Sequence, residues 1–175
     1  MGLIWADTKL GRYDELQREH RILQTCLMSG YGIQDYRYEV PPTPVDHAAR
    51  AVVSLAAANP DGRGVFHISS PQGMQAGVFE RCNAIAGTSL ELLPLHRWTR
   101  EIERLYRQGQ SMPIVPLIEQ SFGLDEASFH ERERLETRKP HFDCTRTYAA
   151  LDAAGIEAPV LDDELLRACI QRLLS

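Results

Sequence analysis

Short apolar runs and helical spacings alternate along the first part of the chain. The run Leu3-Ile4-Trp5 is followed by polar residues, which predicts a buried strand. Apolar positions then recur at intervals of four, three and four residues, which predicts a one-sided helix that Gly30 ends as a C-terminal cap. The residues of this stripe are Leu16, His20, Leu23 and Leu27.

A second helix is expected after the tyrosine-rich extended stretch at residues 36–40. The prolines that follow this stretch are expected to end strand pairing. Thr43 is a candidate helix cap, Pro44 suits the first helical position, and Asp46 complements the positive end of the helix. The turn sequence at residues 59–62 is expected to end this helix.

The rest of the chain is dominated by helical patterns. Val65-Phe66-His67-Ile68 predicts a second buried strand, and residues 89–95 could form a short strand or an extended connector. Beyond residue 72, apolar or charged patterns predict helices at residues 74–85, 98–105, 114–122, 130–139, 148–151 and 165–173, with Asp162 as a cap for the last. Two buried strands alone make no stable parallel sheet. The expected fold class is therefore α/β, mainly helical, and it matches the C-terminal part of a larger unit with an added helical lobe.

Composition and charge narrow the function classes. The 175 residues carry a formal net charge of −5 and are 43% hydrophobic, as expected of one domain or part of a larger one. The mild acidity argues against nucleic-acid binding, and no run of about twenty apolar residues predicts a membrane span. The first residues lack a signal-peptide pattern. We expect a cytoplasmic protein with reduced thiols, and neither zinc nor disulfides, at Cys26, Cys82, Cys144 and Cys169.

The sequence contains no self-contained catalytic motif. It lacks a glycine-rich dinucleotide fingerprint, a phosphate loop, a nucleophile elbow and a His-Glu-x-x-His motif. Lys9 and Lys139 are its two lysines, and neither lies four residues after a tyrosine, so a Tyr-x-x-x-Lys pair is absent. His67 is interpreted as a core or strand-end residue, and His141 as the neighbour of a helix-capping Asp143 rather than a metal ligand. We expect no catalytic residue, cofactor or metal site in this chain alone.

Four arginines follow a helical spacing of three, four and three: Arg97, Arg100, Arg104 and Arg107. This spacing places their guanidinium groups on one stripe of a helix. The stripe could dock an anionic partner, such as an acidic protein helix or a phosphate-bearing arm. The favoured interpretation is a solvated helix face balanced by Glu101 and Glu103.

Two stretches of the sequence carry a family resemblance that covers nearly all of the chain. The run Pro-Thr-Pro-Val-Asp-His-Ala-Ala-Arg-Ala-Val-Val at residues 42–53, followed by residues 64–68, resembles the C-terminal half of extended short-chain dehydrogenase/reductases. More narrowly, it resembles the thioester reductase domains that end nonribosomal peptide and polyketide synthases. The later stretch at residues 142–147 is similar to the tail of those domains. The tail resemblance continues through Ala150, Leu151, Gly155, Ile156, Pro159, Asp162, Leu165 and Leu166.

The resemblance implies a parent domain whose upstream Rossmann portion binds NADPH. That parent reduces an acyl or peptidyl thioester, carried by a phosphopantetheinylated carrier protein, to an aldehyde or alcohol. Because this chain lacks the glycine fingerprint and the Tyr-Lys pair, it is expected to be the substrate-binding C-terminal portion. The implied division is residues 1–71 for strands and crossover helices, 72–140 for a helical substrate lobe, and 141–175 for C-terminal helices packing back on the lobe.

The resemblance also implies positions for the site. Residues 3–5 resemble the sixth strand of the family, the loop after them would border the substrate channel, and residues 65–68 resemble the last strand. The implied substrate-binding residues are Trp5, Asp7, Arg12 and Trp98, and the arginine stripe is the candidate carrier-docking surface. Two alternatives stay open: another extended dehydrogenase, such as a fatty acyl-CoA reductase or a sugar-nucleotide epimerase, or a non-catalytic carrier-docking module.

Overall fold

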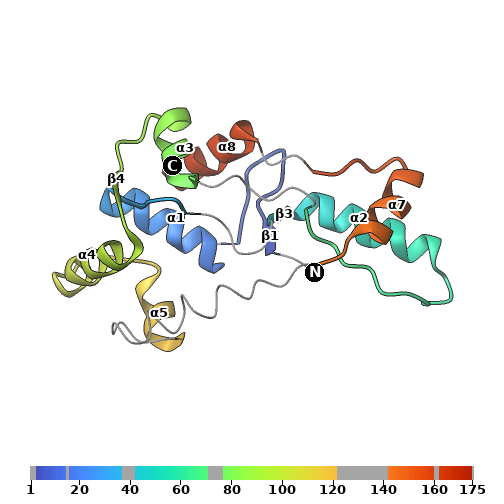
Figure 1. Ribbon diagram of the computed structural model, residues 1–175, viewed down its shortest axis with the longest axis horizontal. Helices are drawn as coiled ribbons and strands as arrows, with labels where there is room; N and C mark the ends of the chain where they lie inside the picture. The colour runs from blue at the N-terminus through green and yellow to red at the C-terminus, as the bar shows by residue number, and fades with distance from the viewer. Residues whose placement is uncertain are drawn as a thin grey trace.

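The structure, a computed structural model, describes residues 3–14, 16–36, 42–70, 77–121, 142–159 and 162–174. It is mainly helical with few strands (Figure 1). The elements in chain order are β1 Leu3–Trp5, α1 Arg18–Ser29, β2 Tyr31–Ile33, β3 Pro42–Pro44, α2 Val45–Ala58, α3 Val78–Ala86, β4 Glu91–Leu93, α4 Leu95–Arg107, α5 Val115–Ser121, α7 Thr145–Ala153 and α8 Asp163–Leu174. Met74 and the predicted helix at 130–139 lie outside the described residues, as do His141 and most of the stretch 36–40.

The described strands form two parallel pairs. β1 pairs with β3, with Ile4 opposite Thr43, and β2 pairs with β4, with Gly32 opposite Leu92. The strand predicted at Leu3–Trp5 is confirmed, and residues 91–93 settle the choice between strand and connector. The expectation that the prolines end strand pairing is wrong, because β3 runs from Pro42 to Pro44. Proline removes only its own N–H, so the carbonyls and the N–H of Thr43 remain to pair.

The strand predicted at Val65–Ile68 is wrong. Among the described residues this segment belongs to no sheet, and the side chain of Val65 is 74% exposed. The two serines that follow the segment bond to α7 and β3: the hydroxyl of Tyr148 donates to Ser69 O at 2.6 Å, and Ser70 N donates to Thr43 Oγ1 at 2.9 Å. An apolar run of four residues therefore does not suffice for a strand here, since no described strand pairs with it, and the run contributes Ile68 to the smaller core instead.

Helix ends follow the sequence signals, with one correction. Gly30 ends α1 in the left-handed conformation at φ 77°, and Gly87 ends α3 at φ 64°. Leu165 N donates to the carboxylate of Asp162 at 2.9 Å, so the predicted cap of α8 is confirmed. Thr43 does not cap α2, because its hydroxyl accepts the hydrogen bond from Ser70 N described above.

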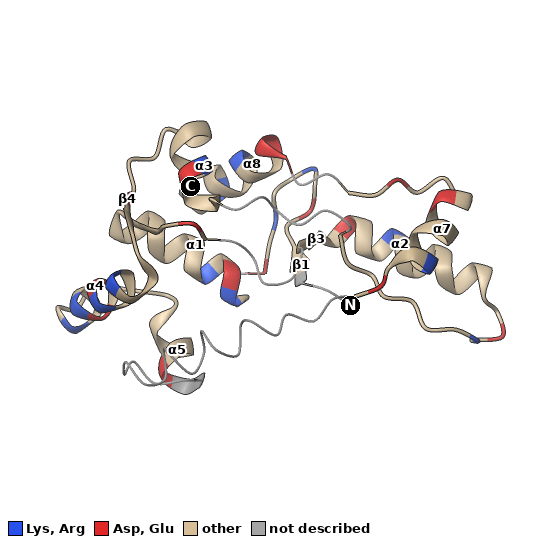
Figure 2. Cartoon of the chain, viewed as in Figure 1, with Lys and Arg blue, Asp and Glu red and all other residues tan. Residues whose placement is uncertain are grey.

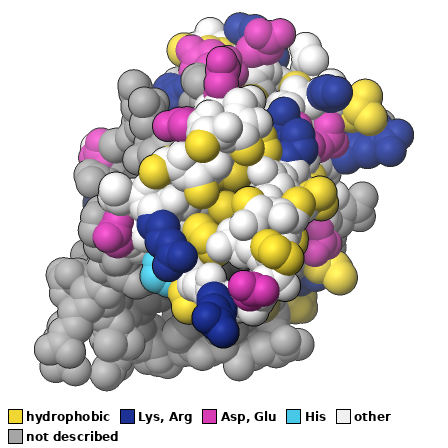
Figure 3. Space-filling view, turned by 90° about the vertical axis from the view of Figure 1, so that its right-hand side faces the viewer, with side chains coloured by type: hydrophobic (Ala, Val, Ile, Leu, Met, Phe, Trp, Pro, Cys, Tyr) yellow, Lys and Arg dark blue, Asp and Glu magenta, His cyan; other side chains and the backbone are white. Residues whose placement is uncertain are grey.

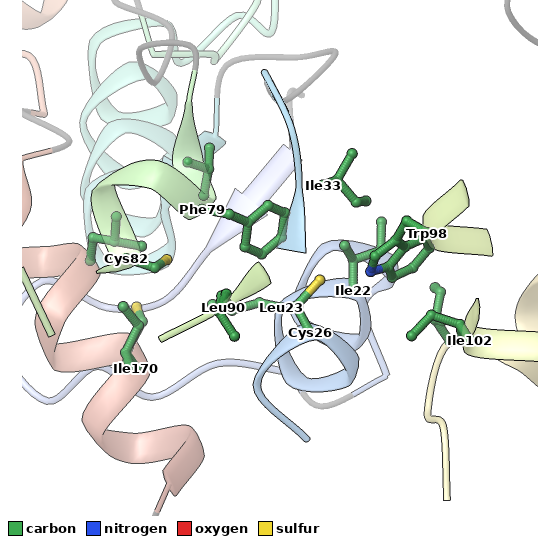
Figure 4. Close-up of a cluster of buried hydrophobic side chains, with 14 of the residues drawn as sticks. Ile22, Leu23, Cys26, Ile33, Phe79, Cys82, Leu90, Trp98, Ile102 and Ile170 are labelled. Carbon is green, nitrogen blue, oxygen red and sulfur yellow. The ribbon is translucent and has the colours of Figure 1, made fainter. Parts of the chain in front are cut away.

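Two hydrophobic cores organise the described residues. The larger core lies among α1, α3, α4, α5 and α8, where Phe79, Leu23 and Ile102 are buried (Figure 4). The smaller core lies between α2 and α7, where Leu151 packs against Ala51. Figure 1 shows α2 and α7 together at one end of the molecule and the other helices toward the opposite end.

This arrangement differs from the implied division at residue 141. Helix α8 packs on α3 of the lobe, whereas α7 packs on α2. The cause is in the sequence of α7, whose buried apolar residue Leu151 fits the small side chains of Ala48 and Ala51. The two C-terminal helices therefore serve different cores.

Candidate functional site

The carboxyl ends of β1 and β3 form a shared edge of the first sheet. Because the strands are parallel, the loop after β1 and the first turn of α2 meet there. Thr8 joins them: its N–H donates to one carboxylate oxygen of Asp46 at 3.1 Å, and its hydroxyl donates to the other at 2.7 Å. In open parallel sheets this edge is the usual place for a ligand.

Asp7 shapes the loop at this edge. Its carboxylate accepts hydrogen bonds from Lys9 N at 3.1 Å, Leu10 N at 2.7 Å and Arg12 N at 3.0 Å. The hydrogen bond from Leu10 contributes most to lowering the pKa of Asp7, and those from the other two amides add to it. Asp7 therefore positions the backbone of the loop.

The loop also rests on α8 through a glycine. Gly11 has φ 62°, and a Cβ at this position would lie 3.2 Å from the backbone carbonyl of Ala168. Only glycine combines this conformation with this approach. The loop consequently bridges α8 and, through Thr8, α2.

The predicted substrate-binding residues are distributed over the loop and the larger core. Arg12 is exposed on the loop, and Trp5 lies at its base with 1% of its surface exposed. Trp98 is 2% exposed on α4, and its indole N–H donates to Tyr31 O at 3.1 Å (Figure 4). The structure thus brings Trp5, Asp7 and Arg12 together and gives both tryptophans packing roles. Contact of these four residues with a substrate stays a prediction.

His20 lies in an aromatic stack beneath the loop. Its ring is 4.6 Å from that of Trp5 on one side and 4.5 Å from that of Tyr13 on the other. Both ring nitrogens are buried, and no described residue hydrogen-bonds to them. Burial lowers the pKa of His20 to about 4, against a smaller opposing effect of Asp14. The ring is therefore uncharged at neutral pH.

The sequence placed His20 on the apolar stripe of α1 but did not identify the stack, because its two partners come from β1 and the following loop. His47, at the start of α2, is likewise buried with unpartnered ring nitrogens among the described residues. Burial contributes most to lowering its pKa, followed by the positive charge of Arg50. His67 is exposed, which corrects the expected core position, and its Nδ1 lies 3.3 Å from Asp143 O.

All four arginines of the stripe are exposed on α4 (Figure 2). Arg104 forms an ion pair with Glu101, with Nε to Oε1 at 3.0 Å, and Arg107 forms one with Glu103. Hydrogen bonding to Arg104 contributes most to lowering the pKa of Glu101. These pairs match the solvated-face interpretation for this half of the stripe, and carrier docking stays a prediction.

The four cysteines are free thiols in this structure. Cys26, Cys82 and Cys169 are buried, and Cys144 is half-buried. Burial raises the pKa of Cys82 and of Cys169 to about 12. In the part of the chain that the structure describes, no cluster of three or more His, Cys, Asp or Glu side chains is placed to hold a metal. No helix within that part is both long enough and apolar enough to cross a bilayer.

The β1–α1 connection does not fit the pyrophosphate of a dinucleotide. Such a site needs backbone N–H groups free to bind phosphate at the start of a helix that directly follows the strand. Here the N–H groups of Lys9, Leu10 and Arg12 are taken by Asp7, and residues 6–17 separate β1 from α1. The described residues therefore offer no cradle for NADPH at this connection.

The fold is similar to that of reductase domains from multidomain synthases. No known family model matches the sequence, and no curated protein matches it either. One similar structure is the terminal R domain from the myxalamid PKS-NRPS biosynthetic pathway, with TM-score 0.67 and 19% identity over 98% of this chain and 42% of that one. Another is a thiolation-reductase di-domain from an archaeal non-ribosomal peptide synthetase, with TM-score 0.65 and 17% identity over 98% of this chain and 34% of that one. The chain thus spans less than half the length of either structure.

Proposed function

We propose that this chain is the substrate-binding, C-terminal portion of an NADPH-dependent thioester reductase. The parent enzyme releases a carrier-bound acyl or peptidyl thioester as an aldehyde or alcohol. The observation that carries this proposal is the fold, which nearly the whole chain shares with two reductase-domain structures. The coverage of 42% and 34% of those structures supports the role of one portion of a larger domain.

In this proposal NADPH binds to an upstream Rossmann portion of the same parent. The chain supplies the last part of an extended short-chain dehydrogenase domain, in which the parallel β1–β3 pair belongs to the Rossmann sheet. The occupied amides of the loop after β1 support this assignment, because they leave phosphate binding to another part of the protein.

The substrate contacts of the proposal begin at the same loop. Asp7 and Thr8 hold the loop in one conformation, so no binding energy is needed to order it. The exposed guanidinium group of Arg12 suits a phosphate or carbonyl oxygen of an acyl-phosphopantetheine arm. The carrier protein itself would dock on α4, where Arg97 and Arg100 are exposed near its first turns.

The test compares this chain with its complete parent. The parent is expected to consume NADPH, followed by its absorbance, when given a carrier-bound acyl thioester and not when given a nucleotide sugar or acyl-CoA. Calorimetry is expected to detect no binding of NADPH to the chain alone. Turnover by the chain alone, or a parent that acts on nucleotide sugars, would overturn the proposal.

A second measurement tests the docking surface. Arg97→Glu combined with Arg100→Glu is expected to weaken binding of the phosphopantetheinylated carrier at least tenfold, and the loss should shrink as salt is added. Arg63→Glu is the matched control, since Arg63 is exposed on a loop outside α4. Equal affinities of the double variant and the control would mean that the arginines of α4 do not bind the carrier.

A further inference from the structure

The buried imidazole ring of His20 lies beside the point where the loop after β1 begins. Trp5, the last residue of β1, stacks on one face of the ring at an interplanar angle of 27°. Tyr13 of the loop stacks on the other face at 18°. The two nitrogens of an imidazole form their hydrogen bonds in the plane of the ring, at its edge. Stacking on both faces therefore leaves these nitrogens without partners.

The unpartnered nitrogens lower the stability of the folded chain. The side chain of His20 is 1% exposed, and no described residue hydrogen-bonds to either nitrogen. A buried donor or acceptor in this situation has lost its hydration and has gained no hydrogen bond in return. Phenylalanine would occupy the stack without this penalty. Such groups are uncommon in native proteins, and a functional role is one reason for their retention.

An exposed histidine at the other end of the molecule provides the contrast. His67 lies next to α7, and its Nδ1 is 3.3 Å from Asp143 O. Figure 3 faces the end that α2 and α7 form, and it shows a histidine side chain at the surface there. Water can hydrogen-bond to a ring in this position, so its nitrogens need no other partner. His20 lacks this possibility as long as the stack is closed.

Solvent reaches the stack on the side of Tyr13. Trp5 is 1% exposed, whereas Tyr13 is half-buried. The hydrogen bonds to Asp7 fix the loop as far as Arg12, and Tyr13 is the first residue after them. A rotation of the Tyr13 side chain would thus uncover His20 and leave the fixed part of the loop in place.

The chemistry of the ring selects the kind of group that it can bind. The lowered pKa of His20 keeps the ring uncharged at neutral pH, so it carries one N–H donor and one acceptor nitrogen. A secondary amide carries the complementary pair, a carbonyl oxygen that accepts and an N–H that donates. A phosphate suits the exposed guanidinium group of Arg12 better, because that group is always charged. The uncharged ring therefore fits an amide.

We propose that His20 binds a secondary amide of the phosphopantetheine arm after the side chain of Tyr13 has moved aside. This inference rests on the proposed function, which supplies the arm and places one of its oxygens at Arg12. Because Arg12 and Tyr13 are adjacent in the loop, an arm bound at Arg12 passes close to the stack. In the bound state His20 donates its ring N–H to the carbonyl oxygen of the amide. The ligand thus provides a partner that the free chain lacks.

The experiment measures the affinity of this chain for three thioesters by nuclear magnetic resonance titration. S-octanoyl pantetheine carries amides in its arm, the propyl thioester of octanoic acid carries none, and the propyl thioester of N-octanoylglycine carries one in its acyl part. His20→Phe keeps a ring in the stack and should weaken binding of the pantetheine thioester about tenfold, since one hydrogen bond is lost. The same variant should bind the other two thioesters as the wild type does.

Two further variants separate hydrogen bonding from packing at this position. His20→Gln keeps a donor and an acceptor without the ring, and it should recover part of the lost affinity for the pantetheine thioester. His67→Phe is the matched control, because His67 is exposed and lies outside the stack. It should leave all three affinities unchanged.

Tyr13→Ala tests the movement of the cover. Because its ring no longer has to be displaced, this variant should bind the pantetheine thioester about threefold more tightly. Tyr106→Ala, on α4, is the control and should bind it as the wild type does. Unchanged or weaker binding by Tyr13→Ala would overturn the inference.

The remaining outcomes are equally decisive. If the wild-type chain bound no pantetheine thioester, or if His20→Phe bound it with wild-type affinity, His20 would be a packing residue only. Dependence on His20 for the glycine thioester alone would place the amide in the acyl part and overturn the assignment to the arm. NADPH consumption by the complete parent is measured separately. An inactive parent would remove the proposed function and leave the amide site, whereas an active parent with a chain insensitive to His20→Phe would do the reverse.

Discussion

The two cores of this protein are built from different side chains. The larger core contains both tryptophans and three of the four cysteines, together with Phe79. The smaller core contains two alanines, Ala48 and Ala51, and three branched residues, Leu55, Ile68 and Leu151, with no buried aromatic ring among them. Five helices contribute to the larger core, whereas the smaller core is formed by α2, α7 and the segment that contains Ile68. The comparison indicates that the larger core, with its aromatic rings and its many elements, is the more self-contained of the two.

The cores also differ in how they hold polar groups. The larger core keeps His20 uncharged between two aromatic rings. Next to the smaller core, two hydrogen bonds hold Ser69 and Ser70 in place: the hydroxyl of Tyr148 donates to Ser69 O, and Ser70 N donates to the hydroxyl oxygen of Thr43. Burial raises the pKa of Tyr148 to about 12, so this hydroxyl remains a donor up to strongly alkaline pH.

The largest expected effect is a cavity in the larger core. Phe79→Ala removes a side chain that is 1% exposed and should lower the free energy of unfolding by about 4 kcal/mol. Urea unfolding followed by circular dichroism measures the change. Tyr106→Ala on α4, where the ring is partly exposed, should cost about 1 kcal/mol or less. Similar losses for both variants would contradict a self-contained larger core.

The next effect is the contribution of His20, in the larger core, to the pH dependence of stability. Below pH about 6.5 the unfolded chain protonates His20, whereas the folded chain resists protonation down to pH about 4. The free energy of unfolding should therefore decrease as the pH falls through this range, by about 3 kcal/mol in total, and this contribution should be constant above it. His20→Phe keeps a ring in the stack and removes the titration. Urea unfolding of both proteins at several pH values is followed by tryptophan fluorescence. The free energy of unfolding should decrease more steeply with falling pH in the wild type than in His20→Phe. Equal slopes for the two proteins would contradict a buried, uncharged His20.

A cavity in the smaller core should have a local effect. Leu151→Ala removes the side chain that packs against α2 and should cost about 2 to 3 kcal/mol. Because α2 and α7 belong to this core and α1 and α3 belong to the larger one, amide hydrogen exchange should accelerate in α2 and α7 and stay unchanged in α1 and α3. Uniform acceleration across all four helices would mean that the two cores unfold as one unit.

The smallest effect is expected at the joint between the cores. Thr8→Val removes the hydroxyl that donates to Asp46 and should cost about 1 kcal/mol. Thr8→Ser is the control, because it keeps the hydroxyl. Hydrogen exchange at the start of α2 should increase in the valine variant alone, and equal exchange in the two variants would assign no role to this contact.

Helices were predictable from the sequence because their apolar spacing and glycine ends are local signals, as in α1 and α3. The strands β2, β3 and β4 have three residues each, too few for a periodic pattern to identify. The segment at Val65–Ile68 resembled a strand, but its neighbours decide its state: Arg146 lies 4.8 Å over the ring of Phe66, and the adjacent Ser69 bonds to α7.

The candidate site was predictable only in part. The resemblance implied a loop after β1 and named Asp7 and Arg12 on it, together with Trp5 at the end of the strand. Sequence could not show that Asp7 is occupied by three backbone amides or that Trp5 stacks on His20, because those contacts depend on how the loop closes on α1 and α8. The positions of the arginines along α4 were predicted correctly, because residues three or four apart lie on the same side of a helix.

The distribution of thiols makes the two cores separately observable. Cys26, Cys82 and Cys169 all belong to the larger core, while Cys144 stands at the start of α7 and is half-buried. A disulfide reagent should therefore modify Cys144 first, and the three remaining thiols only as fast as the larger core opens. The modification rate of these three thiols in the wild-type chain therefore measures how often the larger core opens.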